Sequence, residues 1–232
     1  MNFFGGLYSY EVVMLILGVI LFVVSIILLI RGRKGLAGYF VLAIAMVGYP
    51  SIRSIEYKDG AITIEKNTHE LQQDPTNPQT RQALRQELAK IESRPVPDAR
   101  TATIIARAQF ALGNETAAAA NLQKALYSDP RSSEALALKQ KIDAIQQLDR
   151  LTAEVKSNPQ NATAKEDLAK HLAQATREPI ANPDALAKVA QAQAAMGNHQ
   201  EAVSNAEKAI KINPNSPAAI ELRRSLPIAP RQ

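Results

Sequence analysis

An internal duplication without gaps constrains the fold of this chain more than any other feature. Two Gly-Asn pairs, each followed by a proline at the same distance, lie 84 residues apart (198 − 114 = 84). They are Gly113-Asn114 with Pro130 and Gly197-Asn198 with Pro214. The segments 106–112 and 190–196, which precede the two pairs, also match each other. A gapless duplication of this kind is typical of helical repeat arrays, which present surfaces for binding rather than enclosed active sites.

The two copies of the duplication cover residues 67–142 and 151–226, within a repeat domain that we predict over residues 66–226. Apolar residues recur there at three- and four-residue steps, which indicates helices, and Pro, Gly and Asn mark the breaks. The predicted helices span residues 65–73, 80–93, 99–112, 115–128, 132–156, 163–176, 183–196, 200–212 and 217–226. The sequence therefore predicts an all-α fold class, with a disordered tail over residues 227–232.

The amino-terminal part of the chain contains two apolar segments. The first, residues 12–30, carries no charge, and at about 1.5 Å per residue it is long enough to cross a hydrocarbon core of about 30 Å. The second covers residues 35–52. Together they predict a transmembrane helical hairpin over residues 11–52. A cleaved signal peptide is the alternative, but no Lys or Arg precedes the first segment and the segment is long for a signal sequence.

The short loop between the two apolar segments indicates the orientation of the hairpin. It contains Arg31, Arg33 and Lys34, and loops rich in Lys and Arg stay on the cytoplasmic side. The repeat domain would then lie outside the cytoplasm, which is the periplasm for an inner-membrane protein of a Gram-negative bacterium. Basic residues that closely follow the second segment, such as Arg53 and Lys58, favour the opposite orientation.

Residues 53–65 connect the predicted hairpin to the repeats. Apolar residues alternate on both sides of Asp59-Gly60, and Asp-Gly between alternating apolar residues is a strong signal for a two-residue turn. The pattern predicts a small juxtamembrane β-hairpin, and an extended linker is the alternative. An isolated hairpin is marginal in water, so it would need to pack on the helical domain or on a partner.

The net charge of the repeat domain gives no indication of nucleic-acid binding. Removal of the three basic residues of the loop and of Glu11 from the totals leaves 24 basic (27 − 3) and 21 acidic (22 − 1) residues. We therefore expect no nucleic-acid partner, since the sequence lacks a basic cluster with interleaved aromatic residues. The chain has no cysteine, which excludes disulfides, thiol catalysis and cysteine-ligated metals.

The residues around the two Gly-Asn pairs resemble the tetratricopeptide repeat (TPR), a two-helix unit of about 34 residues. In this family, small residues lie where the two helices cross, and a proline follows the second helix. The matching residues are Ala106, Gly113, Ala118, Ala125 and Pro130 in the first copy and Ala190, Gly197, Ala202, Ala209 and Pro214 in the second. The resemblance implies a TPR-like α-solenoid and, with the apolar hairpin, a membrane-anchored bacterial TPR protein. The intervening segment, residues 132–176, lacks the consensus.

The resemblance also implies a binding site. In TPR proteins the first helix of each pair lines a concave groove that binds a protein or a peptide. The groove-facing positions of the family fall here on Arg100, Thr103, Arg107, Phe110, Asp184, Lys188 and Gln191. Arg100 and Arg107 could bind carboxylates of a partner through two hydrogen bonds each, or could be solvated surface residues.

We find no pattern that predicts an enzyme, a metal site or a cofactor. The three histidines, His69, His171 and His199, are far apart in the sequence and have no second ligand at helical spacing. The sequence also lacks a glycine-rich phosphate loop. Glu166 and Asp167 precede Lys170 on one predicted helix, where a surface charge pair is the simpler interpretation.

Three hypotheses on function follow from these features. The first is a membrane-anchored scaffold or assembly factor that binds protein partners through the groove. The second is a chaperone for an exported polypeptide, because two anchoring helices before a repeat domain are similar to the repeat-bearing subunit of cytochrome c maturation systems. The third is a structural protein that assembles into a homo-oligomer, either through its repeat arrays or through the apolar stripe of residues 138–155. Packing in the core of the array is the alternative use of that stripe.

Overall fold

The computed structural model describes residues 7–31, 37–96, 98–215 and 217–225. Within these ranges the chain forms ten α-helices and no β-strand. The helices are α1 (Ser9–Ile30), α2 (Ala37–Gln73), α3 (Pro78–Glu92), α4 (Ala99–Leu112), α5 (Glu115–Ser128), α6 (Ser133–Ser157), α7 (Ala162–Ala175), α8 (Pro183–Ala195), α9 (His199–Ile212) and α10 (Pro217–Ser225). The predicted tail, residues 227–232, lies outside the described residues.

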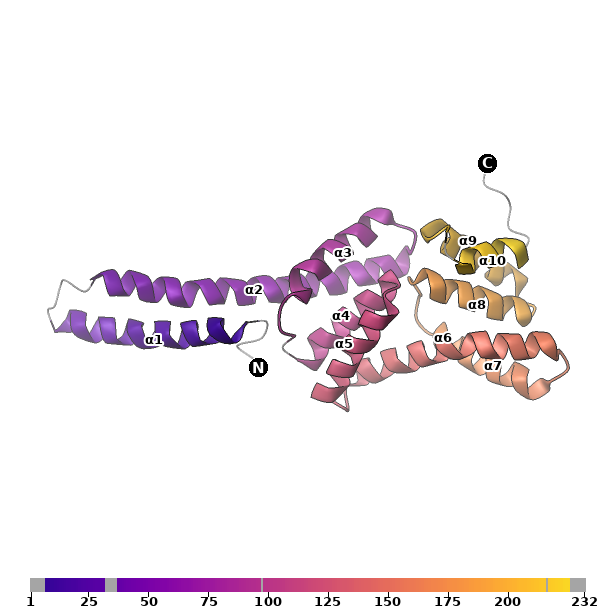
Figure 1. The fold of residues 1–232 in the computed structure, drawn as a ribbon, viewed down its shortest axis with the longest axis horizontal. Coiled ribbons are helices and arrows are strands. Elements are labelled where there is room, and N and C mark those ends of the chain that lie inside the picture. Colours follow the sequence, from indigo (N-terminus) through magenta and orange to yellow (C-terminus); the bar gives the residue numbers. More distant parts are fainter. Residues whose placement is uncertain (1–6, 32–36, 97, 216, 226–232) are drawn as a thin grey trace.

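The helices form an elongated molecule with two parts. Figure 1 shows α1 and the first half of α2 side by side as an antiparallel pair that projects from a body of stacked helices. Helix α2 continues from this pair into the body, where it packs on α3 and α4 (Figure 1). The first residue of α1 lies near the body, at the same end of the pair where α2 enters the body (Figure 1).

Close packing at one glycine holds α1 against α2. A Cβ atom added at Gly18 would lie 2.8 Å from the Cβ atom of Met46, so a larger side chain would force the helices apart. Farther along, the rings of Phe22 and Phe40 stack with centroids 5.0 Å apart. Most other large apolar side chains of α1 face outward and are exposed. Both helices are long and apolar enough to cross a membrane.

The segment predicted as a β-hairpin or linker is helical, so this prediction is wrong. Residues 53–65 lie inside α2, which has no interruption from Ala37 to Gln73. The residues of α2 that face the body recur at alternating steps of three and four residues, which is the period of a helix. They are Ser54, Tyr57, Ala61, Ile64, Thr68 and Leu71. A Cβ atom added at Gly60 would lie 3.1 Å from Cγ2 of Ile91, so glycine permits the close approach of α2 and α3.

The body consists of two units related by the 84-residue duplication. The first unit comprises α2 from Ser54 onward, α3, α4 and α5, and the second comprises α6 from Leu138 onward, α7, α8 and α9. Within each unit, consecutive helices form two antiparallel pairs. Residues of α6 that correspond to the buried residues of α2 are buried as well: Leu138, Lys141, Ile145, Leu148, Thr152 and Val155. The duplication therefore extends into the segment that the alternation pattern had assigned to a β-hairpin.

Asparagine and aspartate begin corresponding helices in the two units. The side chain of Asn77 accepts hydrogen bonds from the first turn of α3, and Asn161 does so at α7. Asp98 and Asn182 cap α4 and α8 in the same way. Such caps satisfy backbone N–H groups that have no partner within the helix, which stabilises each start by about 1 kcal/mol.

Small residues lie where the paired helices cross. All six alanines of the repeat pattern are at most 2% exposed: Ala106, Ala118, Ala125, Ala190, Ala202 and Ala209. Gly113 and Gly197 follow α4 and α8 with φ of 91° and 85°, a left-handed conformation that side chains with a Cβ atom rarely adopt. Pro130 and Pro214 lie in the turns after α5 and α9, where the helices have ended.

The apolar stripe of α6 is part of the core. Its members are all less than 9% exposed: Leu138, Ile142, Ile145, Leu148, Leu151 and Val155. They belong to one cluster that continues into α4, α5, α7, α8 and α9. The stripe therefore has no free apolar face, and the proposed homo-oligomer through residues 138–155 is wrong.

Two buried cations fix the loop between α7 and α8. The guanidinium of Arg81 donates to the backbone oxygens of Pro75 (3.1 Å), Ala111 (3.3 Å) and Ala181 (2.9 Å). Burial lowers the pKa of Arg81 to about 10. The Nζ atom of Lys141 donates to the backbone oxygens of Glu178 (3.1 Å) and Pro179 (3.0 Å). The bond from Arg81 to Ala181 joins the first unit to the second, whereas the bonds of Lys141 hold the loop within the second unit.

Candidate functional site

The first helices of successive pairs form one row through the body. Helix α2 packs on α4, α4 on α6, and α6 on α8, whereas α3, α5, α7 and α9 each pack mainly on their own partner. In a repeat array this row lines the inner face. The candidate site is therefore the exposed polar surface of α2, α4, α6 and α8, which we call the inner face.

Helices α2 and α4 contribute a charged section of the inner face. Arg100 is exposed, and its guanidinium lies 3.5 Å from a carboxylate oxygen of Glu65. Farther along α4, Arg107 borders a hollow of about 160 Å³ together with side chains of α2. The other residues around this hollow are Glu65, Thr68, His69, Gln72 and Ile104.

Two residues predicted to line the groove are buried instead. Thr103 has no exposed surface, and its hydroxyl donates to the backbone oxygen of Ala99 at 2.7 Å. Phe110 is 5% exposed and belongs to the core cluster that includes Leu138 and Ile142 of α6. The prediction is wrong for both residues, and for Phe110 the reason is that α6 packs on α4. A face that is open in an isolated repeat is covered here by the next helix.

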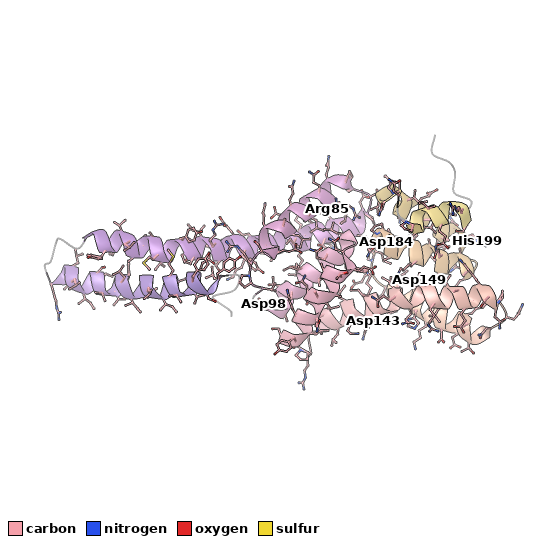
Figure 2. All side chains as sticks on the ribbon, in the orientation of Figure 1. Arg85, Asp98, Asp143, Asp149, Asp184 and His199 are labelled. Carbon is pink, nitrogen blue, oxygen red and sulfur yellow. The ribbon has the colours of Figure 1, made fainter. Side chains whose placement is uncertain are left out.

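The second unit contributes ion pairs of the same kind. The Nζ atom of Lys188 on α8 lies 3.0 Å from a carboxylate oxygen of Asp149 on α6. Asp184 and Gln191 lie on α8 and are half-buried. Figure 2 labels Asp149 and Asp184, which come from the neighbouring helices α6 and α8. The polar row therefore extends from the first unit into the second.

Arg107 of α4 and Lys141 of α6 lie close enough for their charges to interact. Burial lowers the pKa of Lys141, the carboxylate of Glu178 raises it, and the charge of Arg107 lowers it further. Lys141 is bonded to the loop between α7 and α8, so Arg107 is the cation of this pair that a ligand can reach. This region could bind a carboxylate of a partner.

The sequence did not indicate the contribution of α2 to the site. Glu65, Thr68 and His69 border the hollow at Arg107. They lie on the helix predicted over residues 65–73, but the prediction of a β-hairpin or linker over residues 53–65 separates that helix from the apolar pair. The helical spacing of Tyr57, Ile64 and Leu71 was the signal that could have identified α2 as the first helix of the row.

The described residues contain no group of three or more His, Asp or Glu side chains that could hold a metal ion. Two ion pairs between neighbouring helices lie on the inner face, Arg100 with Glu65 and Lys188 with Asp149. Such a surface can exchange internal ion pairs for pairs with a partner, which suits protein binding.

The fold and the inner face define a class of protein: a helical repeat protein with an amino-terminal pair of apolar helices. Residues 99–132 and 183–216 each match the family model of the tetratricopeptide repeat. These segments contain α4 with α5 and α8 with α9, so each unit carries one such repeat as its second helix pair. No curated protein and no solved structure matches the chain significantly.

Proposed function

We propose that this protein is a membrane-anchored scaffold or assembly factor that binds a protein partner on its inner face. The observation that carries the proposal is the continuity of α2. One helix of 37 residues begins in the apolar pair and ends as the first helix of the row, where Glu65 pairs with Arg100 of α4. An anchor and a binding surface that share a helix cannot move independently.

The apolar surface of the pair supports the anchor. Side chains such as Val13, Ile20, Val23 and Leu42 are between 50% and 54% exposed, and they lie on both helices. Apolar patches of this extent are rare on soluble monomers and mark contact with lipid or with another protein. Tyr8, Tyr10 and Tyr49 lie at the end nearest the body, as aromatic residues do at a membrane surface.

The basic loop at the other end of the pair supports the orientation. Because Lys and Arg are retained in the cytoplasm, residues 31–34 would lie inside and the body outside, at the outer face of a bacterial inner membrane. Anchoring confines partner and scaffold to the same surface and raises their effective concentration. A face with moderate affinity can therefore be sufficient.

Labelling of a single cysteine tests the orientation. The chain has no cysteine of its own, and Ser133 is an exposed residue at the start of α6. A Ser133→Cys variant in intact cells should react with a maleimide that does not cross membranes. Protection until the cells are lysed would place the body in the cytoplasm and overturn the proposed orientation.

Charge reversal on the inner face tests the binding site. We expect Arg107→Glu to lose partners that are captured by crosslinking in cells, while membrane insertion and helix content stay unchanged. Arg131→Glu, in the turn before α6, is the matched control because Arg131 is exposed and lies off the inner face. Equal capture by wild type and both variants would contradict the proposed site.

A further inference from the structure

A second cleft lies between α2 and α3, next to the apolar pair. It encloses about 660 Å³, and both helices contribute side chains of either charge to its walls. We call it the juxtamembrane cleft. Its charged residues are Arg53, Glu56, Asp59, Glu87, Lys90 and Arg94.

One wall of this cleft contains a buried hydroxyl without a partner. Tyr57 is 3% exposed, and its hydroxyl accepts and donates no hydrogen bond within the described part of the chain. A buried polar group without a partner costs about 1–3 kcal/mol, so an unbound tyrosine hydroxyl here is unfavourable. Phenylalanine would fill the same space without that cost.

In the second unit, the side chain at the position that corresponds to Tyr57 has hydrogen-bond partners. Tyr57 corresponds to Lys141 (57 + 84 = 141), which binds the backbone oxygens of Glu178 and Pro179. The corresponding residues of the first unit are Arg94 and Pro95 (178 − 84 = 94). At the membrane end of the molecule the internal bond is thus missing, and an open cleft borders the same position.

The cleft lies at the height of lipid headgroups if the apolar pair crosses a membrane. Arg53 is the first charged residue along α2, and its guanidinium lies 5.4 Å from the centroid of the Tyr49 ring. Tyr57 is four residues farther along α2, which is about 6 Å at 1.5 Å per residue. The headgroup layer of a bilayer is about 5–8 Å thick on each side.

The charged side chains of the cleft favour a zwitterionic ligand, which has no net charge but carries a positive and a negative group. Three basic and three acidic side chains line it, and they form mixed pairs. The Arg53 and Glu56 side chains approach to 3.3 Å, and those of Lys90 and Glu87 to 2.6 Å. Arg94 pairs with the buried Glu11 of α1 at 3.9 Å. An anionic ligand would meet as many carboxylates as cations.

We propose that the juxtamembrane cleft binds the headgroup of a phospholipid that carries both a phosphate and a primary ammonium group, of the phosphatidylethanolamine type. The Tyr57 hydroxyl and the cations contact the phosphate, and the carboxylates accept hydrogen bonds from the ammonium group. A quaternary ammonium group cannot donate these bonds, so a choline headgroup is a poorer ligand. This proposal rests on the membrane anchoring proposed above.

Lipid retention by the full-length protein tests the proposal. The protein is placed in nanodiscs that contain equal amounts of phosphatidylethanolamine, phosphatidylcholine and phosphatidylglycerol, and the retained lipids are counted by native mass spectrometry. We expect the wild-type protein to retain phosphatidylethanolamine preferentially. In Tyr57→Phe this preference should be about 5–10-fold smaller, because one hydrogen bond to the lipid is lost. Tyr127→Phe is the control, because Tyr127 is 91% exposed and far along the chain from the cleft.

A second variant copies the other unit. Tyr57→Lys places at this position the side chain that binds the loop carbonyls in the second unit. The lysine should bind the corresponding carbonyls of the first unit, so that the protein itself occupies the position of the ligand. We expect it to lose the lipid preference and to show a higher Tm than wild type in lipid-free detergent.

Four outcomes would overturn the proposal. They are equal retention of the three lipids by wild type, an unchanged preference in Tyr57→Phe, a preference for the anionic lipid, and binding of soluble phosphoethanolamine without retention of the lipid. Protein that does not insert into nanodiscs at all would overturn the anchoring as well. Inserted protein without a lipid preference would overturn the lipid site alone.

Discussion

The two units of the body share the same buried apolar positions, but they differ in the polar residues that contact their surroundings. Positions 84 residues apart are buried alike along α2 and α6: Ile64 and Leu148 have no exposed surface, and Leu71 and Val155 are at most 2% exposed. The polar residues differ. Tyr57 corresponds to Lys141, and the buried Arg81 corresponds to the exposed Lys165 (81 + 84 = 165).

This difference shows that the apolar positions, which the two units share, determine how the helices stack within a unit. The buried polar positions, which differ, depend on what packs against each unit. Arg81 is buried because the second unit covers it and provides the backbone oxygen of Ala181. Lys165 is exposed, and α10 packs on α8 and α9, with Leu222 fully buried. The first unit instead meets α1, where the Tyr8 hydroxyl donates to the backbone oxygen of Ser93.

The largest expected effect comes from the arginine between the units. Arg81→Met should lower the free energy of unfolding by about 3 kcal/mol, because three buried backbone oxygens lose a charged donor. The corresponding Lys165→Met should change it by less than about 0.5 kcal/mol, since Lys165 is exposed. Urea unfolding followed by circular dichroism measures both. Equal losses would contradict the asymmetry of the units.

A smaller loss is expected at the buried lysine of the second unit. Lys141→Met should cost about 2 kcal/mol, because two loop carbonyls lose their donor while the cost of burying a charge is relieved. The same variant should also change how the stability of the protein depends on pH. Burial holds the pKa of Lys141 in the folded protein below its ordinary value of 10.5. Between these two pKa values the unfolded chain binds more protons than the folded one, so wild-type stability rises with pH towards 10.5.

Chemical denaturation of wild type and Lys141→Met at several alkaline pH values measures this contribution. The difference between the two proteins should shrink as the pH falls, because the charged lysine is then unfavourable in the core. A difference that does not vary with pH would contradict the assigned cause of the pKa shift.

The two helix-ending glycines should respond alike. Gly113→Ala and Gly197→Ala each force a residue with a Cβ atom to adopt φ near 91° or 85°, which costs about 1 kcal/mol. Neither Cβ atom would clash, because the nearest atom at Gly113 is 3.8 Å away and Gly197 has none within 4 Å. Thermal unfolding of both variants should therefore give similar shifts. A much larger shift at one glycine would show that the units differ there too.

The smallest effect is confined to high pH. Burial and, to a smaller extent, the charge of Asp98 raise the pKa of Tyr57 to about 12, against the opposing effect of Arg94. The unfolded chain therefore loses the proton first, and stability falls as pH rises above 10. Tyr57→Phe should remove this loss, which is under about 1 kcal/mol at pH 10.5. Tyrosinate absorbance during an alkaline titration checks the ionisation itself. A Tyr57 that ionises together with exposed Tyr127 would contradict the assignment.

The helix boundaries of the body were predictable because their signals are local. Caps such as Asn161 and Asn182, the turn glycines and the apolar steps act within a few residues, so α4, α5 and α9 have the predicted bounds to within one residue. The burial of the six repeat alanines is likewise expected for small residues where paired helices cross.

The site was less predictable because burial at α4 depends on the helix that follows. Arg100 and Arg107 lie on the inner face, whereas Thr103 and Phe110, on the same predicted face, are buried, and Phe110 belongs to a core cluster with residues of α6. The spacing of residues on α4 alone cannot show where another helix crosses it. Glu65 and His69 lie on the helix predicted over residues 65–73. Its continuity with the apolar pair required α2 to be helical through residues that also fit a turn.

The sequence by itself determined the duplication, the all-α fold with two apolar helices and the TPR-like helix pairs, because each depends on spacing along the chain. The tertiary structure decided that α2 is one helix from the apolar pair to the inner face. Asp59-Gly60 is a strong local signal for a turn, but burial of Tyr57, Ala61 and Ile64 against the body outweighs it. Contacts between distant parts of the chain, and not local preference, set the state of that segment.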